Sequence, residues 1–315
     1  MAFKILLANT RGFCAGVERA IGVVQRALEK FGAERVYVLH EVVHNKHVVA
    51  DLVSKGAHLV EELSEIPEPS TKVVIFSAHG VGLDTIEQAQ KLGLTVIDAT
   101  CPLVKRIHTK VVKAAQNNME VVIIGHDGHR EVLGTLGQYA GPKDKVHVIL
   151  TPEDVANLSL PLGAHQAMFA TQTTLSIDET AKTVAALKAK FPLIEGPKND
   201  DTCYATQHRQ AAVKLLAQEC QLVLIAGSQN SSNSRRLSEV AQQYGATSYL
   251  IDDASAITDD MLQGVTAVGV SAGASVPEYI VQDILTTLKN KGATQIEPVG
   301  EIQRHITFAW PQGLE

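Results

Sequence analysis

The stretch VIDATC, residues 96–101, has the pattern of a buried β-strand that ends in an acidic and small-residue turn and delivers a cysteine. A helical pattern follows at once, because Val104, Ile107 and Val111 recur at helical spacing. The end of this stretch is repeated in DDTC, residues 200–203, and more loosely in NTRGFC, which ends at Cys14. The sequence therefore predicts three repeats of roughly one hundred residues, each with a cysteine at the start of a helix.

The three repeats continue with the same order of elements. β-branched runs that begin at Val36, Val121 and Leu222 are typical of buried parallel strands. A second helix and strand follow, and then come a second buried strand and a closing helix. The second buried strands are expected at residues 73–80, 167–174 and 267–275, and the closing helices at 84–92, 176–190 and 277–291. The fold class indicated is α/β, with three pseudo-threefold-related αβ domains built on parallel sheets.

The repeats set the expected domain boundaries. We expect a first αβ domain over residues 14–100, a second over 101–198 and a third over 199–299. An N-terminal strand within residues 1–13 and a C-terminal arm, 300–315, are expected to pack near the first domain, with Phe308 and Trp310 as anchors of the arm. Residues 192–198, PLIEGPK, are expected to form a linker, because Pro and Gly interrupt both helix and strand.

Composition narrows the class of protein. The chain has 315 residues, 45% of them hydrophobic, which is enough for packed cores. A net charge of −6 and an aromatic content of 4% argue against nucleic acid as a partner. No signal peptide or membrane span is indicated, so we expect a cytoplasmic protein with no membrane partner. In that reducing compartment, cysteines at matching positions are metal ligands or reactive groups more often than disulfides, whereas Cys220 is expected to be buried as a small hydrophobe.

Unusual polar residues gather where the predicted strands end. Ligands of open parallel sheets bind beyond the carboxyl ends of the strands. If the three domains pack around a pseudo-threefold axis, these residues would converge on one central cavity. They are Cys14, Cys101 and Cys203; His44, His129, Ser231, Ser232 and Asn233; and His79, Thr173 and Ser275.

The residue types in these loops suggest metal and anion chemistry. Three cysteines without a local CxxC pair favour a site assembled between domains, and their soft sulfur ligands leave zinc and an iron–sulfur cluster equally open. A cubane cluster held by three cysteines would leave one iron open. Hydroxyl, amide and imidazole groups, together with helix N-termini, suit a diphosphate. Glu131, two residues after His129, would serve as a proton source if its pKa is raised.

With these residues laid out, the chain resembles the 4-hydroxy-3-methylbut-2-enyl diphosphate reductase family, which catalyses the last step of the methylerythritol phosphate route to isoprenoids. The resemblance runs from Leu6 to Ser275. It is carried, in chain order, by ANTRGFCAGVERAI, HEVVHN, FSAHGV, DATCPLV, GHDGH, TQTTLS, DDTCYAT, GSQNSSNS and SAGAS.

The resemblance implies three αβ domains around one central [4Fe-4S] cluster per chain, held by Cys14, Cys101 and Cys203, with the substrate hydroxyl at the open iron. It implies reductive dehydroxylation to isopentenyl and dimethylallyl diphosphates, with electrons from a ferredoxin or flavodoxin-type donor. Protons would be delivered through Glu131 and Thr173, with His129 nearby. The residues that match the family's substrate-binding set are His44, His79, His129, Thr173, Ser231, Ser232, Asn233 and Ser275.

The chain departs from the family pattern at one position. Many members have proline where this chain has Arg130, so the loop before Glu131 is expected to be less rigid and more positive.

Three other functions compete with the reductase. A hydro-lyase using the cluster as Lewis acid would need carboxylate-binding arginines, which these loops lack. A zinc hydrolase with Glu131 as general base would be colourless. A sensor that loses its cluster on oxidation would not need so many converging polar positions.

Overall fold

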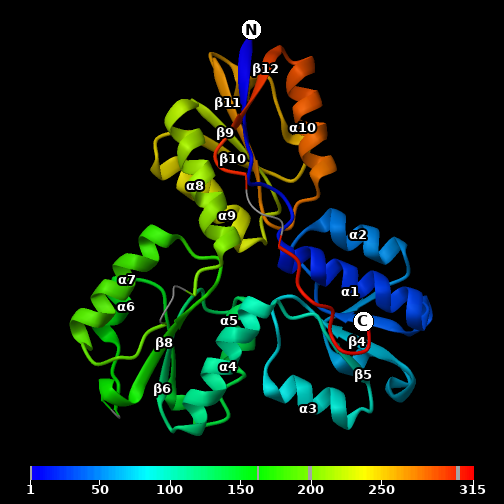
Figure 1. Cartoon of the computed structure of the whole chain (residues 1–315), viewed down its shortest axis with the longest axis vertical. Coiled ribbons are helices and arrows are strands. Elements are labelled where there is room, and N and C mark those ends of the chain that lie inside the picture. The colour runs from blue at the N-terminus through cyan, green and yellow to red at the C-terminus, as the bar shows by residue number, and fades with distance from the viewer. Residues whose placement is uncertain (1, 162, 198–200, 303–305) are drawn as a thin grey trace. The chain divides into compact units, whose positions relative to one another are not determined.

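The computed structural model describes residues 2–161, 163–197, 201–302 and 306–315, and these form α-helices and parallel β-sheets (Figure 1). The chain separates into two compact units. Unit 1 comprises Met1–Val17, His44–Val49 and Tyr204–Thr307, and unit 2 comprises Glu18–Val43, Ala50–Cys203 and Phe308–Glu315. Among the described residues, no helix combines the length and the apolar character that crossing a membrane would require.

Unit 1 is built on one five-stranded sheet. Its strand order is β10-β9-β11-β1-β12, and every neighbouring pair is parallel. Helix α10 covers one face and helices α8 and α9 cover the other, so the sheet is buried on both sides (Figure 1). The bounds are β1 Phe3–Ala8, β9 Leu222–Ala226, β10 Thr247–Ile251, β11 Ala267–Ala272, β12 Ala293–Val299, α8 Tyr204–Glu219, α9 Ser232–Gln243 and α10 Glu278–Asn290.

The N-terminal strand does not join the first predicted domain, so the placement expected from the sequence is wrong. β1 lies between β11 and β12, with Ile5 in register with Val268 and Ile296. Ile5 packs in the core on the α10 side, and Leu6 packs in the core on the α8 side. An apolar run that is buried on both faces takes a central position in the larger sheet. Strand β12 was not predicted at all, and its Pro298 is tolerated because β12 is an edge strand.

Unit 2 contains two smaller parallel sheets. The first has the order β3-β2-β4-β5, with α1 and α3 on opposite faces (Figure 1). The second has the order β7-β6-β8, with α4 packed on one face and α7 on the other. The bounds are β2 Val36–Leu39, β3 His58–Val60, β4 Val73–Phe76, β5 Thr95–Asp98, β6 Glu120–Ile124, β7 Val146–Ile149, β8 Ala167–Thr171, α1 Ala15–Phe31, α2 Lys46–Ser54, α3 Leu83–Lys91, α4 Pro102–Gln116, α5 Arg130–Leu136, α6 Pro152–Asn157 and α7 Ile177–Lys190.

The segment expected to be a linker adds a short pairing to the second sheet instead. The Phe169 N–H donates to the Glu195 carbonyl at 2.8 Å, and the Glu195 N–H donates to the Ala167 carbonyl at 2.9 Å. Ile194, beside this bridge, is buried in the core of the sheet. The free edge of β8 offers unpaired N–H and C=O groups, and this segment satisfies them. Lys198, the last residue of the expected linker, lies outside the described residues.

The end of the C-terminal arm contacts helix α1. The Trp310 ring lies so close to Gly22 that a Cβ there would be 2.6 Å from a ring carbon, and the Arg26 guanidinium lies 4.3 Å from the centre of the Trp310 ring. Leu314, which was not expected as an anchor, is buried, whereas Phe308 is half-buried. The side chain of Arg19 donates to the Ala309 carbonyl at 2.7 Å and fastens the arm further.

Candidate functional site

The three cysteines occupy equivalent positions relative to the three sheets. Each directly precedes a helix: Cys14 precedes α1, Cys101 is the N-cap of α4, and Cys203 precedes α8. Each cysteine N–H also donates to a carbonyl in the loop that follows a strand. These bonds are Cys14 to Ala274 after β11 (3.1 Å), Cys101 to Ala78 after β4 (3.0 Å) and Cys203 to Thr173 after β8 (3.1 Å). The repeated position expected from the sequence is therefore a repeated hydrogen-bonding position.

The surroundings of these cysteines fit metal ligation. None of the three forms a disulfide, all have half-buried side chains, and a helix N-terminus stabilises a thiolate. Thiolate sulfur is a preferred donor for iron–sulfur clusters and for zinc. Within either unit, the residues that the structure describes include no group of three His, Cys, Asp or Glu side chains placed to hold a metal ion. Asp200 of the DDTC turn lies outside the described residues. Cys220 is buried, as expected, and burial raises the pKa of its thiol to about 12.

A buried carboxyl group lies beside the Cys203 loop. Glu131, in the first turn of α5, has only 4% of its surface exposed. Thr173 donates to the two carboxyl oxygens, from its backbone N–H at 2.7 Å and from its hydroxyl at 2.8 Å. Burial raises the pKa of Glu131 to about 7, although both bonds from Thr173 act to lower it. A carboxyl group of this kind can exchange a proton near neutral pH.

Two histidines of unit 2 lie close to this carboxyl group. His129 is the N-cap of α5, and its Nδ1 accepts a hydrogen bond from the Glu131 N–H at 3.1 Å. A neutral imidazole that accepts at Nδ1 carries its proton on Nε2. The His79 ring lies edge-on to the His129 ring, with 6.1 Å between the ring centres. The structure thus brings together His79, His129, Glu131 and Thr173.

Close backbone contacts between glycines hold α5 against the loop that follows β4. A Cβ on Gly134 would lie 2.7 Å from the Gly80 carbonyl oxygen, and a Cβ on Gly137 would lie 2.6 Å from the Gly82 Cα. The Leu83 N–H donates to the Gly137 carbonyl at 2.8 Å. Because His79 precedes Gly80, these contacts set the distance between His79 and α5. Sequence reasoning missed this role for the glycines, since glycine alone does not reveal its partner.

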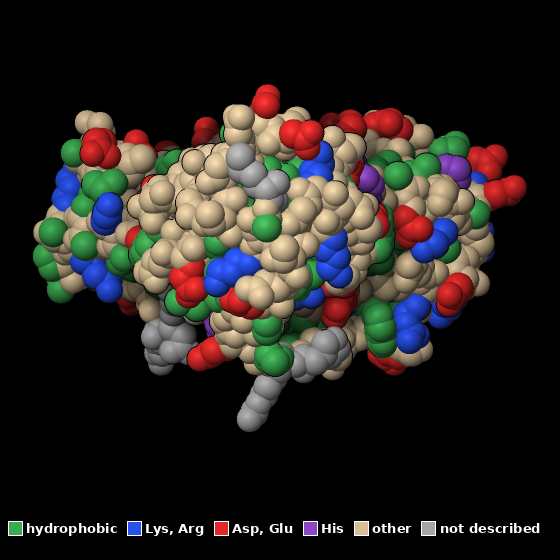
Figure 2. Space-filling model, turned by 90° about the horizontal axis from the view of Figure 1, so that it is seen from above, with side chains coloured by type: hydrophobic (Ala, Val, Ile, Leu, Met, Phe, Trp, Pro, Cys, Tyr) green, Lys and Arg blue, Asp and Glu red, His purple; other side chains and the backbone are tan. Residues whose placement is uncertain are grey.

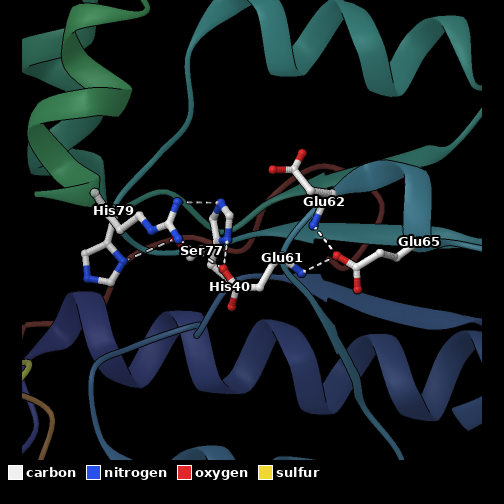
Figure 3. Close-up of polar contacts among 7 residues, drawn as sticks. His40, Glu61, Glu62, Glu65, Ser77 and His79 are labelled. Atoms are coloured by element: carbon white, nitrogen blue, oxygen red, sulfur yellow. Dashed lines mark hydrogen bonds and ion pairs between the residues drawn. The ribbon is translucent and has the colours of Figure 1, made fainter. Parts of the chain in front are cut away.

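Arg130 ties the N-terminus of α5 to residues near the β2 and β3 strands. Two of these residues, His40 and Glu61, are labelled in Figure 3. Its guanidinium donates to Glu61 at 3.0 Å and lies 3.3 Å from the Nε2 of His40. The Nδ1 of His40 lies 3.0 Å from the same Glu61 carboxylate. Glu65 in turn accepts hydrogen bonds from the backbone N–H groups of Glu61 and Glu62. The loop before Glu131 is therefore anchored by an ion pair, a contact that sequence reasoning did not anticipate.

Unit 1 holds the other expected ligand-binding residues near the ends of β9 and β11. The Ser275 hydroxyl donates to the His44 carbonyl at 3.0 Å and fixes the loop that carries this histidine. Ser231 caps α9, since its hydroxyl accepts from the Ser234 N–H at 3.3 Å. Ser231, Ser232, Asn233 and Ser275 are all buried.

Asn233 is the residue of this group that most clearly indicates a ligand. Its side chain is 6% exposed, and neither the amide nitrogen nor the amide oxygen has a hydrogen-bond partner among the described residues. A buried amide without partners costs about 1–3 kcal/mol. A bound group with oxygen atoms would remove that cost.

Arg209 is a further structural contributor that sequence reasoning missed. This buried guanidinium donates to the carbonyls of Gly12, Phe13 and Ala205, and so holds the loop before Cys14 against α8. Its position within a helical pattern gave no signal of this contact. The predicted residues thus form two groups, with His44, Ser231, Ser232, Asn233, Ser275 and Cys14 in unit 1 and His79, His129, Glu131, Thr173, Cys101 and Cys203 in unit 2.

Comparisons with known proteins place the chain in a family. A family model described as LytB protein matches residues 5–289. The chain is 51% identical over 311 residues to 4-hydroxy-3-methylbut-2-enyl diphosphate reductase from Methylococcus capsulatus, covering 99% of this chain and 98% of that protein. The protein of the same name from Aeromonas hydrophila is also 51% identical over 311 residues and covers 99% of both chains.

Solved structures agree with these relatives. The E-1-hydroxy-2-methyl-but-2-enyl-4-diphosphate reductase from Plasmodium falciparum superposes with a TM-score of 0.92 at 33% identity, covering 100% of this chain and 97% of that chain. A structure of (E)-4-hydroxy-3-methyl-but-2-enyl diphosphate reductase superposes with a TM-score of 0.62 at 32% identity, covering 91% and 99%. The α/β class with parallel sheets, expected from the sequence, is confirmed.

Proposed function

Since the chain belongs to the LytB protein family, we propose that it catalyses the reductive dehydroxylation of 4-hydroxy-3-methylbut-2-enyl diphosphate to isopentenyl and dimethylallyl diphosphates. The full-length match to reductases of that name supports the reaction. The proposal includes a cytoplasmic location and a ferredoxin or flavodoxin-type electron donor. It also includes the pseudo-threefold arrangement of the αβ domains that the repeats indicate.

We assign Cys14, Cys101 and Cys203 as the ligands of one [4Fe-4S] cluster. Their equivalent positions at helix N-termini and the absence of a disulfide at any of them support this assignment. When bound, such a cluster supplies electrons and one iron with an open position for the substrate oxygen. The hydrogen bonds from the three cysteine N–H groups fix the main chain at each ligand, and the Arg209 guanidinium fixes it further at Cys14.

Proton delivery is assigned to Glu131 and Thr173. A carboxyl group with its pKa near 7 is protonated in a large fraction of molecules at neutral pH. The Thr173 hydroxyl, which bonds Glu131, would pass a proton between the carboxyl group and the substrate. His129, whose Nδ1 accepts from the Glu131 N–H, presents Nε2–H as a donor to the substrate.

The diphosphate is assigned to a set of imidazole, hydroxyl and amide groups. Each of these groups can donate a hydrogen bond to a phosphate oxygen. The buried amide of Asn233, which has no partner among the described residues, supports this assignment. The full set is His44, His79, His129, Thr173, Ser231, Ser232, Asn233 and Ser275.

The observation that carries the proposal is the buried Glu131 carboxyl group, hydrogen-bonded twice by the residue whose carbonyl also binds the Cys203 N–H. The test is product analysis after anaerobic incubation of the iron-loaded protein with substrate and a chemical reductant. We expect both isomeric diphosphates and one water per substrate. Release of phosphate without these products would identify a hydrolase and contradict the proposal.

A substitution at Asn233 separates substrate binding from folding. Asn233→Leu removes an amide that makes no hydrogen bond among the described residues, so we expect unchanged or higher thermal stability and a KM for substrate raised about tenfold or more. Asn45→Ala is the matched control. The Asn45 carboxamide accepts from two N–H groups at the start of α2, so its loss lowers stability by about 1 kcal/mol.

A further inference from the structure

Helix α4 has a charge pattern that differs from that of the other helices. It carries Lys105, Arg106, Lys110 and Lys113 and no acidic residue, and it is the one such α-helix in the part of the chain that the structure describes. Every other α-helix in the described part of the chain contains at least one Asp or Glu, and the charged residues of α6 are all acidic. On the face shown in Figure 2, Lys and Arg side chains are interspersed with Asp and Glu. In a chain with a net charge of −6, a helix whose charged residues are all basic requires an explanation.

The basic side chains lie on the outer face of this helix. Val104, Ile107 and Val111 are buried on the inner face. Lys105, Arg106 and Lys113 are exposed, and Lys110 is half-buried between them. Arg106, Lys110 and Lys113 form a stripe because positions three and four apart share one side of an α-helix, and Lys105 lies beside this stripe.

This stripe is directly connected to both proposed cluster ligands of unit 2. Cys101 is the N-cap of α4, and its carbonyl accepts from the Lys105 N–H at 2.9 Å. Lys110 binds the buried carboxylate of Asp201, two residues before Cys203. The first turn of α4 and Lys110 are therefore joined by these contacts to the chain segments that carry the two cysteines.

Part of the positive charge remains after nearby carboxylates are counted. Lys105 lies 2.7 Å from Asp98, and Arg106 lies 3.8 Å from the Asp201 oxygen that Lys110 binds. Glu195 lines a hollow of about 410 Å³ beside the helix. The four basic side chains of α4 outnumber the three nearby carboxylates. One of these, Asp201, is fully buried, so the outer surface of the helix keeps a net positive charge.

The helix also stands between two hollows. The hollow of about 410 Å³ has Met119, Met168 and Phe169 in its lining. A second, of about 360 Å³, lies on the other side of α4, and Lys113 lines both. The basic side chains of α4 and the apolar residues in the adjacent hollows together offer the polar rim and the apolar contacts that protein interfaces combine.

We propose that the outer face of α4, defined by Lys105, Arg106, Lys110 and Lys113, is the docking surface for an acidic electron-transfer protein. The inference rests on the proposed function. Replacement of the substrate C–OH by C–H consumes two electrons and two protons and releases water, so electrons must come from an external donor. Electron-transfer complexes have small interfaces that are strongly steered by opposite charges.

The test compares two electron sources for one set of variants. The probes are a reduced, acidic flavodoxin and a small viologen reductant, both used with the anaerobically iron-loaded full chain. For Lys113→Glu and for the double variant Arg106→Gln/Lys113→Glu, we expect the KM for flavodoxin to rise about fivefold or more. Turnover with the viologen should stay unchanged. Lys182→Glu, an exposed lysine on α7 of the same unit, is the control and should leave both activities unchanged.

Direct binding gives a readout that does not depend on turnover. Titration calorimetry with oxidised flavodoxin should show wild-type affinity that falls with added salt, and weaker binding of both α4 variants. Equal affinity of the α4 variants and the Lys182→Glu control would overturn the docking surface. Absence of wild-type turnover with the viologen would instead overturn the proposed function, so the two failures are distinguishable.

Discussion

Thr173 donates to both oxygens of the Glu131 carboxyl group, through its N–H at 2.7 Å and its hydroxyl at 2.8 Å. Thr173→Val keeps the N–H bond and the side-chain shape but removes the hydroxyl. We expect kcat to fall about tenfold to a hundredfold, because one proton-transfer group is lost. The hydroxyl bond lowers the pKa of Glu131, so its loss should also move the alkaline limb of the kcat profile to higher pH. Thr173→Ser, which keeps the hydroxyl, should restore most activity, and an unmoved limb would contradict the contact's role.

The pKa of Glu131 sets the expected pH dependence of activity. Burial raises this pKa from 4.5 to about 7, so the carboxyl group loses its proton as pH rises through neutrality. If Glu131 supplies a proton, kcat should decline above about pH 7. Glu131→Gln cannot supply a proton, and its kcat should fall at least about a hundredfold below that of wild type. A wild-type profile that stays flat from pH 6 to 9 would contradict this role.

The same pKa gives a stability prediction of definite sign. The folded state holds the proton more tightly than the unfolded state, so stability falls as pH rises from about 4.5 to about 7. Above about pH 7 the buried Glu131 carboxylate is ionised, and it continues to lower the stability of the folded state. Glu131→Gln lacks this charge, so its melting temperature relative to wild type should be higher at pH 8 than at pH 5. A difference independent of pH would contradict the raised pKa.

Arg130 and proline should be interchangeable at the start of α5. Arg130 is the first residue of the helix, where proline is favoured, and His129 before it has the extended conformation (φ −67°, ψ 136°) that a residue before proline requires. Arg130→Pro loses an exposed ion pair with Glu61, worth about 0–1 kcal/mol, and gains chain rigidity of similar size. We expect stability within about 1 kcal/mol of wild type and retained kcat. Arg130→Ala loses the ion pair without that gain and should be less stable than Arg130→Pro in urea unfolding; the reverse order would contradict the account.

Gly134→Ala tests the backbone contact between α5 and the loop after β4. The new Cβ would lie 2.7 Å from the Gly80 carbonyl oxygen, and a backbone atom cannot move aside as a flexible side chain can. We expect a loss of about 1–3 kcal/mol in the free energy of unfolding, together with a lower kcat, because His79 is displaced from α5. Leu133→Ala, an exposed position on the same helix, should change stability by less than about 0.5 kcal/mol.

Local pattern predicted most elements, because β-branched runs such as residues 121–124 and helical periodicity after each cysteine are signals within a few residues. It also indicated which residues end the strands, since parallel strands carry ligands at their carboxyl ends. The partner of a strand is not a local property, so β1 was assigned to the wrong sheet. The same limit explains why the Arg130 to Glu61 ion pair and the contact of Gly134 with Gly80 were missed.

The most direct test of the central proposal is iron and sulfide analysis of four cysteine variants purified without oxygen. Wild type and Cys220→Ser should contain about four irons and four sulfides per chain. Cys14→Ser, Cys101→Ser and Cys203→Ser should each lose most of both, while circular dichroism shows that the fold is kept. Stoichiometric zinc in a colourless wild-type protein, or full iron content in any of the three ligand variants, would contradict a cluster held by these three cysteines.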